Sequence, residues 1–294
     1  MGRAASLIAA LAVCAAACLP AAAAERFAHG TLWRVTRGGS APSYVFGTIH
    51  LADPRALQIP EPVMRALERS RSFAMESPPG WAQDGRMIEA AELPAGQALE
   101  PLIGAPAYEK LRAALAPRNI PEAVLARLKP WAALANITVT PEGYESATLD
   151  TKLFELARAR RLRAEALESY DEQVAAFDSI PLESQVAMLR HTLEQRDYLA
   201  SMIEPTLQAW LRRDLAGIRA VNDRIAARFP ELAPHYASFM RHLVDDRSVA
   251  MAHRLYLRLR RGGVFVAVGA THLAGEKGLL RLIEAQGYRV RRVY

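Results

Sequence analysis

Cysteine is almost absent from this chain of 294 residues, and its two copies, Cys14 and Cys18, both lie near the amino terminus. If that amino-terminal segment is removed, the remaining chain can form no disulfide, no cysteine nucleophile and no thiolate metal site. Catalytic or metal-binding chemistry must then come from histidine, carboxylate, hydroxyl and guanidinium groups.

Long apolar stretches are also missing after the first two dozen residues, so the sequence predicts no bilayer-spanning helix there. The net charge is +6, and the densest basic stretches are residues 158–163, 254–261 and 289–292. These stretches lack the interleaved aromatic residues and glycines that are typical of nucleic-acid-binding surfaces. We therefore expect solvated helix faces and a basic final strand, with no nucleic-acid partner.

The first 24 residues have the pattern of a secretory signal peptide. A basic start at Arg3 is followed by an apolar run over residues 7–14 and by small residues up to Ala24. We expect cleavage after Ala24, export to the periplasm or the medium, and a single domain over residues 25–294. Two alternatives remain open, because the segment could stay as an anchor or Cys18 could carry a lipid. Only in those two cases do we expect a membrane as partner.

Segments typical of strands occur towards both ends of the chain and enclose a mostly helical middle. The strand-like segments are residues 31–35, 44–47, 72–76, 264–268 and 288–294. The first two predict a hairpin, and the apolar, β-branched segment 264–268 predicts a strand that is covered on both faces. The expected fold is α/β, with a mixed central sheet flanked by helices and a largely helical middle insertion.

A long helix is expected to begin at Asp245 or Asp246, either of which can act as its cap, and to end near residue 260. Its predicted buried stripe consists of Val249, Ala252, Leu255 and Leu259. Arg247 would lie in the first turn, where a cation faces the positive end of the helix dipole. That position favours a carboxylate or a substrate as partner for Arg247, although a solvated arginine is an equally open interpretation.

Two segments share one pattern, in which an apolar strand runs into a glycine and a histidine follows three residues later. They are Gly47 to His50 and Gly269 to His272. Glycine lets the backbone turn or approach another group closely, and strand ends are the usual place for sheet-based sites. Neutral imidazole is the commonest metal ligand and a good general base. The two histidines form a candidate site, and histidines that only hold the backbone are the alternative.

Carboxylates supply the other candidates. Glu76 ends the strand-like segment 72–76, and two histidines with one carboxylate and an open position make a competent hydrolytic metal site. A glutamate that merely enters solvent at the following turn, residues 77–80, is the alternative. Glu168 could end another strand. Asp150 lies at the start of a predicted helix, where the helix dipole is a sufficient explanation.

Several of these segments, taken in order, resemble the TraB/GumN family. They are residues 45–51, 73–76, 129–131, 167–169, 265–275 and 287–290. The resemblance covers nearly all of the chain after residue 24 and implies kinship with the Tiki metalloproteases and with erythromycin esterase-like and ChaN-like folds. Tiki-branch members are divalent-metal-dependent proteases with two Gly-x-x-His motifs and a glutamate. By that likeness His50, His272 and Glu76 are expected to bind metal and to act in catalysis.

The same likeness implies a role for Arg247, although the asparagine that often follows the family arginine is Ser248 here. Together with the signal-peptide pattern, the resemblance implies an exported hydrolase, a peptidase acting on peptide or protein. Nitrogen and oxygen ligands admit Zn, Mn or Co, and the likeness to the Tiki branch favours Mn or Co. The ChaN-like relatives keep a different class open. That class is a non-catalytic envelope protein that binds haem or another ligand, or that assists polysaccharide or envelope assembly.

Overall fold

The computed structural model describes residues 26–77, 89–138 and 148–294. The expected signal peptide, with Cys18 and its cleavage position Ala24, lies outside the described residues, and so does most of the turn after Glu76. Within the described ranges, no helix combines the length and the apolar character that a bilayer crossing needs.

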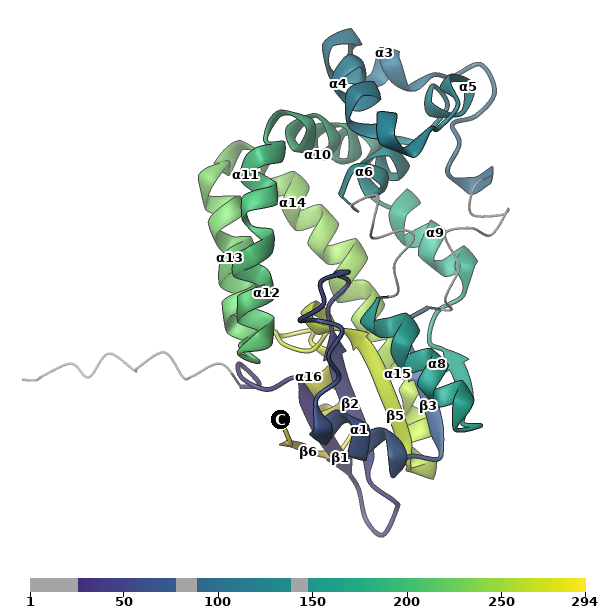
Figure 1. Ribbon diagram of the computed structural model, residues 1–294, viewed down its shortest axis with the longest axis vertical. Helices are drawn as coiled ribbons and strands as arrows, with labels where there is room; N and C mark the ends of the chain where they lie inside the picture. Colours follow the sequence, from purple (N-terminus) through teal and green to yellow (C-terminus); the bar gives the residue numbers. More distant parts are fainter. Residues whose placement is uncertain (1–25, 78–88, 139–147) are drawn as a thin grey trace, which may run out of the picture.

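Six strands in the described part of the chain form one sheet at the base of the molecule (Figure 1). They are β1 (Leu32–Thr36), β2 (Ser43–Thr48), β3 (Ser72–Met75), β4 (Arg163–Ala166), β5 (Val264–Gly269) and β6 (Arg289–Arg292). Their order is β4-β3-β5-β2-β1-β6. The strands β2 to β5 are parallel to one another, whereas β1 is antiparallel to both of its neighbours. The predicted mixed sheet and its hairpin are confirmed.

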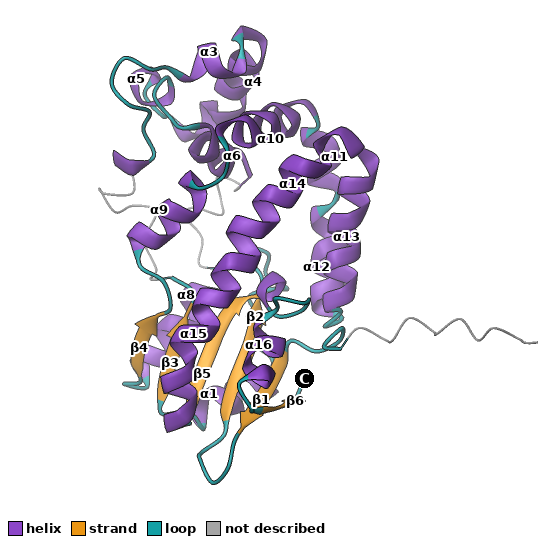
Figure 2. Cartoon of the chain, turned by 180° about the vertical axis from the view of Figure 1, so that it is seen from behind, coloured by secondary structure: helices purple, strands orange, loops and turns teal. Residues whose placement is uncertain are grey.

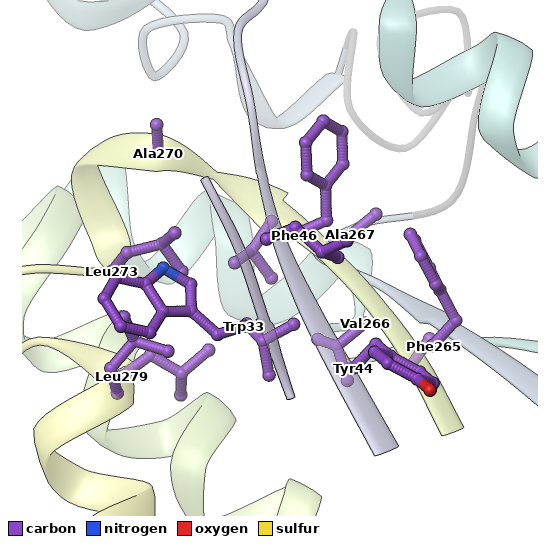
Figure 3. Packing of buried hydrophobic residues seen from close by; sticks show 14 of the residues in the cluster. Trp33, Tyr44, Phe46, Phe265, Val266, Ala267, Ala270, Leu273 and Leu279 are labelled. Carbon is purple, nitrogen blue, oxygen red and sulfur yellow. The ribbon is translucent and has the colours of Figure 1, made fainter. Parts of the chain in front are cut away.

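Helices cover both faces of this sheet. One face carries α1 (Glu61–Glu68) and α8 (Leu149–Ala159), and the other carries α15 (Asp246–Arg261) and α16 (Leu279–Ala285) (Figures 1 and 2). Every residue of β5 is buried, as the apolar run predicted. Figure 3 shows the packing around Phe46 and Phe265, whose ring centroids are 6.4 Å apart. Burial of each phenylalanine side chain contributes about 1.5–3 kcal/mol to the stability of the fold, so this packing helps to hold β2 and β5 together.

The middle of the chain is helical and lies beyond the carboxyl ends of the parallel strands (Figure 1). Its α-helices are α3 (Leu99–Ile103), α4 (Ala105–Leu115), α5 (Glu122–Leu125), α6 (Pro130–Thr138), α9 (Tyr170–Asp178), α10 (Leu182–Glu194), α11 (Arg196–Ser201), α12 (Ile203–Leu211), α13 (Leu215–Arg228) and α14 (Ala233–Met240). Helices α3 to α6 and α10 share a second apolar core that includes Leu99, Trp131 and Leu189. The expected helical insertion is therefore present and has its own buried interior.

The helix that we expected to begin at Asp245 or Asp246 has no cap there. A π-helical turn, Arg241–Asp245, joins α14 directly to α15, and Asp245 has helical dihedral angles and no capping hydrogen bond. The predicted stripe is also wrong at Val249, which is 41% exposed. Ser248 is buried in its place, because its hydroxyl has hydrogen-bond partners inside the protein. Periodicity finds the apolar face but misses a buried polar residue on it.

Candidate functional site

The two histidines and Glu76 meet at one edge of the sheet. His50 follows β2, Glu76 follows β3 directly, and His272 lies in the 3₁₀ turn Ala270–His272 after β5. Because β3, β5 and β2 are adjacent and parallel, their carboxyl ends meet at the same edge. The Oε2 atom of Glu76 lies 4.0 Å from Nε2 of His50 and 3.8 Å from Nε2 of His272. The structure thus brings these predicted site residues together.

The glycines of the two motifs have different tasks. A Cβ atom on Gly269 would lie 3.5 Å from Oε2 of Glu76 and 3.6 Å from Nε2 of His50, so this glycine keeps the space between the polar groups empty. A Cβ atom on Gly47 would lie 2.6 Å from Cδ1 of Leu273. Gly47 is therefore needed for close packing between β2 and the turn after β5. Only Gly269 borders the polar groups.

Ser248 determines which nitrogen of His272 faces Glu76. The Ser248 hydroxyl donates to the carbonyl oxygen of Val244 at 2.7 Å and lies 2.9 Å from Nδ1 of His272. Since the single hydroxyl proton is already used, Nδ1–H of the imidazole is the donor in the second bond. The lone pair of Nε2 then points towards Glu76. Burial lowers the pKa of His272, which favours this neutral form.

Asp150 holds the other histidine in a similar way. Its Oδ2 atom lies 2.9 Å from Nδ1 of His50, and its Oδ1 atom accepts a hydrogen bond of 2.7 Å from Thr48. The negative charge of Asp150 raises the pKa of His50 to about 9. Asp150 does lie in the first turn of α8, but its carboxylate is buried and meets the strand end. The helix dipole is therefore an incomplete explanation for this residue.

Arg247 joins Glu76 to Glu168. Its Nη2 atom donates to Oε1 of Glu76 at 2.6 Å, and its Nε atom donates to both carboxylate oxygens of Glu168 at 3.1 Å. The other Glu76 oxygen, Oε2, accepts from the backbone N–H of Gly269 at 3.2 Å. These bonds fix the rotation of the Glu76 carboxylate, with Oε2 turned towards the histidines.

The charges of this group follow from its contacts. Burial alone would raise the pKa of Glu76, but the cations Arg247 and His50 and the backbone N–H of Gly269 hold it well below its usual range. Burial also opposes the charge on Arg247, and the neighbouring carboxylates Glu76 and Glu168 nevertheless keep the pKa of Arg247 above its usual value. At neutral pH, Glu76 is therefore a carboxylate and Arg247 a cation. A carboxylate partner for Arg247 was one of the two alternatives that the sequence left open.

Glu168 does follow a strand, as expected, since it lies just after β4. It is buried and holds Arg247 instead of facing the histidines. The contacts of Thr48, Asp150 and Ser248 could not be predicted from the sequence. Asp150 was noticed only as a carboxylate in a first helical turn, where the helix dipole is a simpler explanation. Ser248 was noticed only as a departure from the asparagine that the family resemblance leads one to expect.

The chemical kind and the direction of these donor atoms suit a divalent cation, whereas the present distances between them are too long. Among the described residues, no group of three or more His, Cys, Asp and Glu side chains has the spacing of a closed metal site. The separations of 4.0 and 3.8 Å exceed the roughly 3.3 Å between tetrahedral ligands at bonds of about 2.0 Å. Two imidazole nitrogens and a carboxylate oxygen are nevertheless suitable ligands.

A family model for the TraB/PrgY/gumN family matches residues 31–292, a span that includes every residue of the site. The chain belongs to the TraB/PrgY/gumN family. This membership confirms the resemblance seen in the sequence. No curated protein and no solved structure matches the chain significantly. Membership of the TraB/PrgY/gumN family does not by itself fix the reaction, because one fold can carry many activities.

Proposed function

We propose that this TraB/PrgY/gumN chain is an exported, divalent-metal-dependent hydrolase that cleaves peptide bonds. The observation that supports the proposal is the approach of both Nε2 atoms, from His50 and His272, to one carboxylate oxygen of Glu76. Nitrogen and oxygen donors of this kind accept Zn, Mn or Co. The peptide bond as substrate, and a preference for Mn or Co, rest on the resemblance to the Tiki branch. Export rests on the signal-peptide pattern.

The orientation of the two imidazoles favours a metal-binding role over a purely structural one. Histidines that bind metals nearly always present their second ring nitrogen to a carboxylate, a carbonyl or another polar group. Asp150 and Ser248 occupy that position at His50 and His272 respectively. If the two histidines only held the backbone, their Nε2 atoms would not need to point towards the same place.

In this proposal the residues of the chain bind the cation, orient its ligands and leave one side of the site open to substrate. A cation bound by His50, His272 and Glu76 would polarise a carbonyl oxygen and make a bound water more acidic. Arg247 keeps Glu76 ionised and holds its Oε1 atom away from the histidines. The side chain of His50 is 58% exposed, whereas that of His272 is 5% exposed. Substrate would therefore approach from the His50 side.

The proposal is tested by titrating the full chain, freed of metal with a chelator, with Mn, Co and Zn in a calorimeter. The matched variants are His50→Ala, His272→Ala and, as control, His253→Ala, which alters an exposed histidine on α15. We expect one ion per chain, with binding lost in the first two variants and kept in the third. Hydrolysis of a mixed peptide library, followed by mass spectrometry, should show the same dependence.

Two results would contradict the proposal. One is a folded native chain that binds none of the three ions. The other is metal binding and peptide hydrolysis that persist unchanged in both His50→Ala and His272→Ala. The first result would favour the non-catalytic alternative, an envelope protein that binds another ligand, whereas the second would place metal binding and hydrolysis at another site. A haem titration monitored at the Soret band would then test the haem-binding form of that alternative.

A further inference from the structure

A cavity of about 430 Å³ lies at the opposite end of the sheet from the histidines. It is lined by Arg37, Ser40, Tyr256, Arg260 and Tyr288. The lining residues come from the turn between β1 and β2, from the end of α15 and from the residue just before β6. β2 runs from this cavity towards the histidine site and α15 runs from the histidine site back to the cavity, so the two places are separated by the length of these elements. We call it the Arg37–Arg260 pocket.

The lining carries two positive charges and no carboxylate. Arg37 and Arg260 make no ion pair with any residue in the described part of the chain. Three other arginines of α15 differ, because Arg247, Arg254 and Arg258 each contact a glutamate. Two guanidinium groups beside one cavity repel each other unless an anion lies between them. The pocket is therefore electrostatically suited to an anion.

Arg37 is held in position before any ligand arrives. Its guanidinium carbon lies 5.3 Å from the ring centroid of Tyr288, and its Nη1 atom donates to the carbonyl oxygen of Gln286 at 3.0 Å. Gly287, with a φ of 85°, allows the turn that presents this carbonyl oxygen to Arg37. Arg260 is placed similarly, over the ring of Tyr256 at 5.8 Å. Such fixed donors lose little conformational entropy on binding.

Tyr288 gives a second, independent indication of a ligand. The residue is 4% exposed, and its hydroxyl is buried without a hydrogen-bond partner among the described residues. A buried hydroxyl without a partner costs free energy, and buried polar groups in folded proteins are nearly always paired. A ligand oxygen in the pocket would supply the missing partner. The same residue thus lines the cavity, supports Arg37 and lacks an acceptor for its own proton.

We infer that the Arg37–Arg260 pocket binds the phosphate group of a phosphorylated small molecule. A phosphate presents oxygens in several directions and can meet two guanidinium groups and a phenol together, whereas a planar carboxylate offers only two oxygens. Guanidinium groups match phosphate geometry through paired N–H donors. The cavity volume lies in the range of small-molecule sites, so a sugar or similar group can accompany the phosphate. This site is independent of the proposed hydrolase site.

The test is calorimetric titration of the full chain with inorganic phosphate, glucose 6-phosphate and glucose at low ionic strength. Arg37→Gln and Arg260→Gln should each weaken phosphate binding about tenfold or more, because each removes charge-assisted hydrogen bonds. Tyr288→Phe should weaken it several-fold without lowering the Tm, since it removes a hydroxyl that has no partner in the free protein. Glucose, which has no phosphate, should not bind.

The control is the double variant Arg34→Gln, Arg291→Gln. These two exposed arginines face each other across β1 and β6 and line none of this cavity. The control should bind phosphate as the native chain does. The inference is overturned if native chain binds no phosphate, if the control weakens binding as much as Arg37→Gln does, or if glucose binds as tightly as glucose 6-phosphate.

Discussion

The Ser248 hydroxyl accepts a hydrogen bond from Nδ1 of His272 across 2.9 Å, while it donates its own proton to the carbonyl oxygen of Val244. One serine thereby sets the tautomer of a buried imidazole. It does so from the turn of α15 that follows the π-helical segment Arg241–Asp245. Position 248 thus has a polar role although the residue there is serine, where the family resemblance leads one to expect asparagine.

Replacement of that serine should reveal its orienting role. Ser248→Ala should weaken metal binding about tenfold to a hundredfold, because the imidazole of His272 loses the acceptor that fixes its ring. The free energy of unfolding should fall by about 1–3 kcal/mol, since a buried N–H is left without a partner. Calorimetric metal titration and urea unfolding measure the two effects. Ser201→Ala, which removes an exposed hydroxyl bonded to a helix carbonyl, should change neither.

Asp150→Asn should weaken metal binding to a similar degree, about tenfold to a hundredfold, because His50 would lose its charged partner. The amide keeps the shape of the side chain and an acceptor for Thr48, so the Tm should change little. Asp171→Asn is a matched control, since Asp171 lies in the first turn of α9 and is exposed. Equal metal affinity in the two variants would show that Asp150 does not orient His50.

The two motif glycines should respond differently to the same substitution. Gly47→Ala should lower stability by about 1–3 kcal/mol, because its Cβ would lie 2.6 Å from Cδ1 of Leu273 in a packed interior. Gly269→Ala should leave the Tm nearly unchanged, since its Cβ contacts are of ordinary van der Waals length, but should abolish metal binding. Thermal unfolding and metal titration of both variants separate the two roles. A metal-binding Gly269→Ala chain would contradict the site.

Arg247→Gln should be among the most destabilising changes in the chain, at about 3–5 kcal/mol, because it leaves Glu76 and Glu168 buried without their common cation. Glu168→Gln should cost less, since Arg247 would still be balanced by Glu76. Urea unfolding at neutral pH measures both. The reverse order of stability would mean that the guanidinium is not what holds the two carboxylates together.

Acid should destabilise the helical part of the chain through His191. This histidine of α10 is buried against Phe229, at 4.3 Å between ring centroids. Burial lowers the pKa of His191 below its usual 6.5, although Glu194 and Glu231 oppose the shift. Because the folded state disfavours the proton, the stability contribution is complete above pH 6.5 and is lost as the pH falls.

The pH effect is measured by urea unfolding at pH 7.5 and pH 5. The native chain should lose more stability between these values than His191→Gln, which cannot take up the proton. His253→Gln, at an exposed histidine, should behave like the native chain. The same loss of stability in the native chain and in His191→Gln would assign the effect to other groups.

Much of the fold could be predicted because the central strands are recognisable from the apolar, β-branched residues that form them. The run Val264–Gly269 is apolar and β-branched, and it is buried throughout. The start of α15 could not be predicted in the same way. Aspartate is a good helix cap in isolation, but at Asp245 the preceding helix continues through a π-helical turn, so no free helix end exists there for a cap to satisfy.

The sequence by itself determined that His50, Glu76 and His272 each follow a strand, since local periodicity and glycine placement locate strand ends. Only the tertiary structure decided that these strands are adjacent and parallel, which brings the three side chains to one edge. It also decided which nitrogen of each histidine faces Glu76, through Asp150 and Ser248. Those contacts join residues far apart in the chain, and periodicity carries no information about partners at such separations.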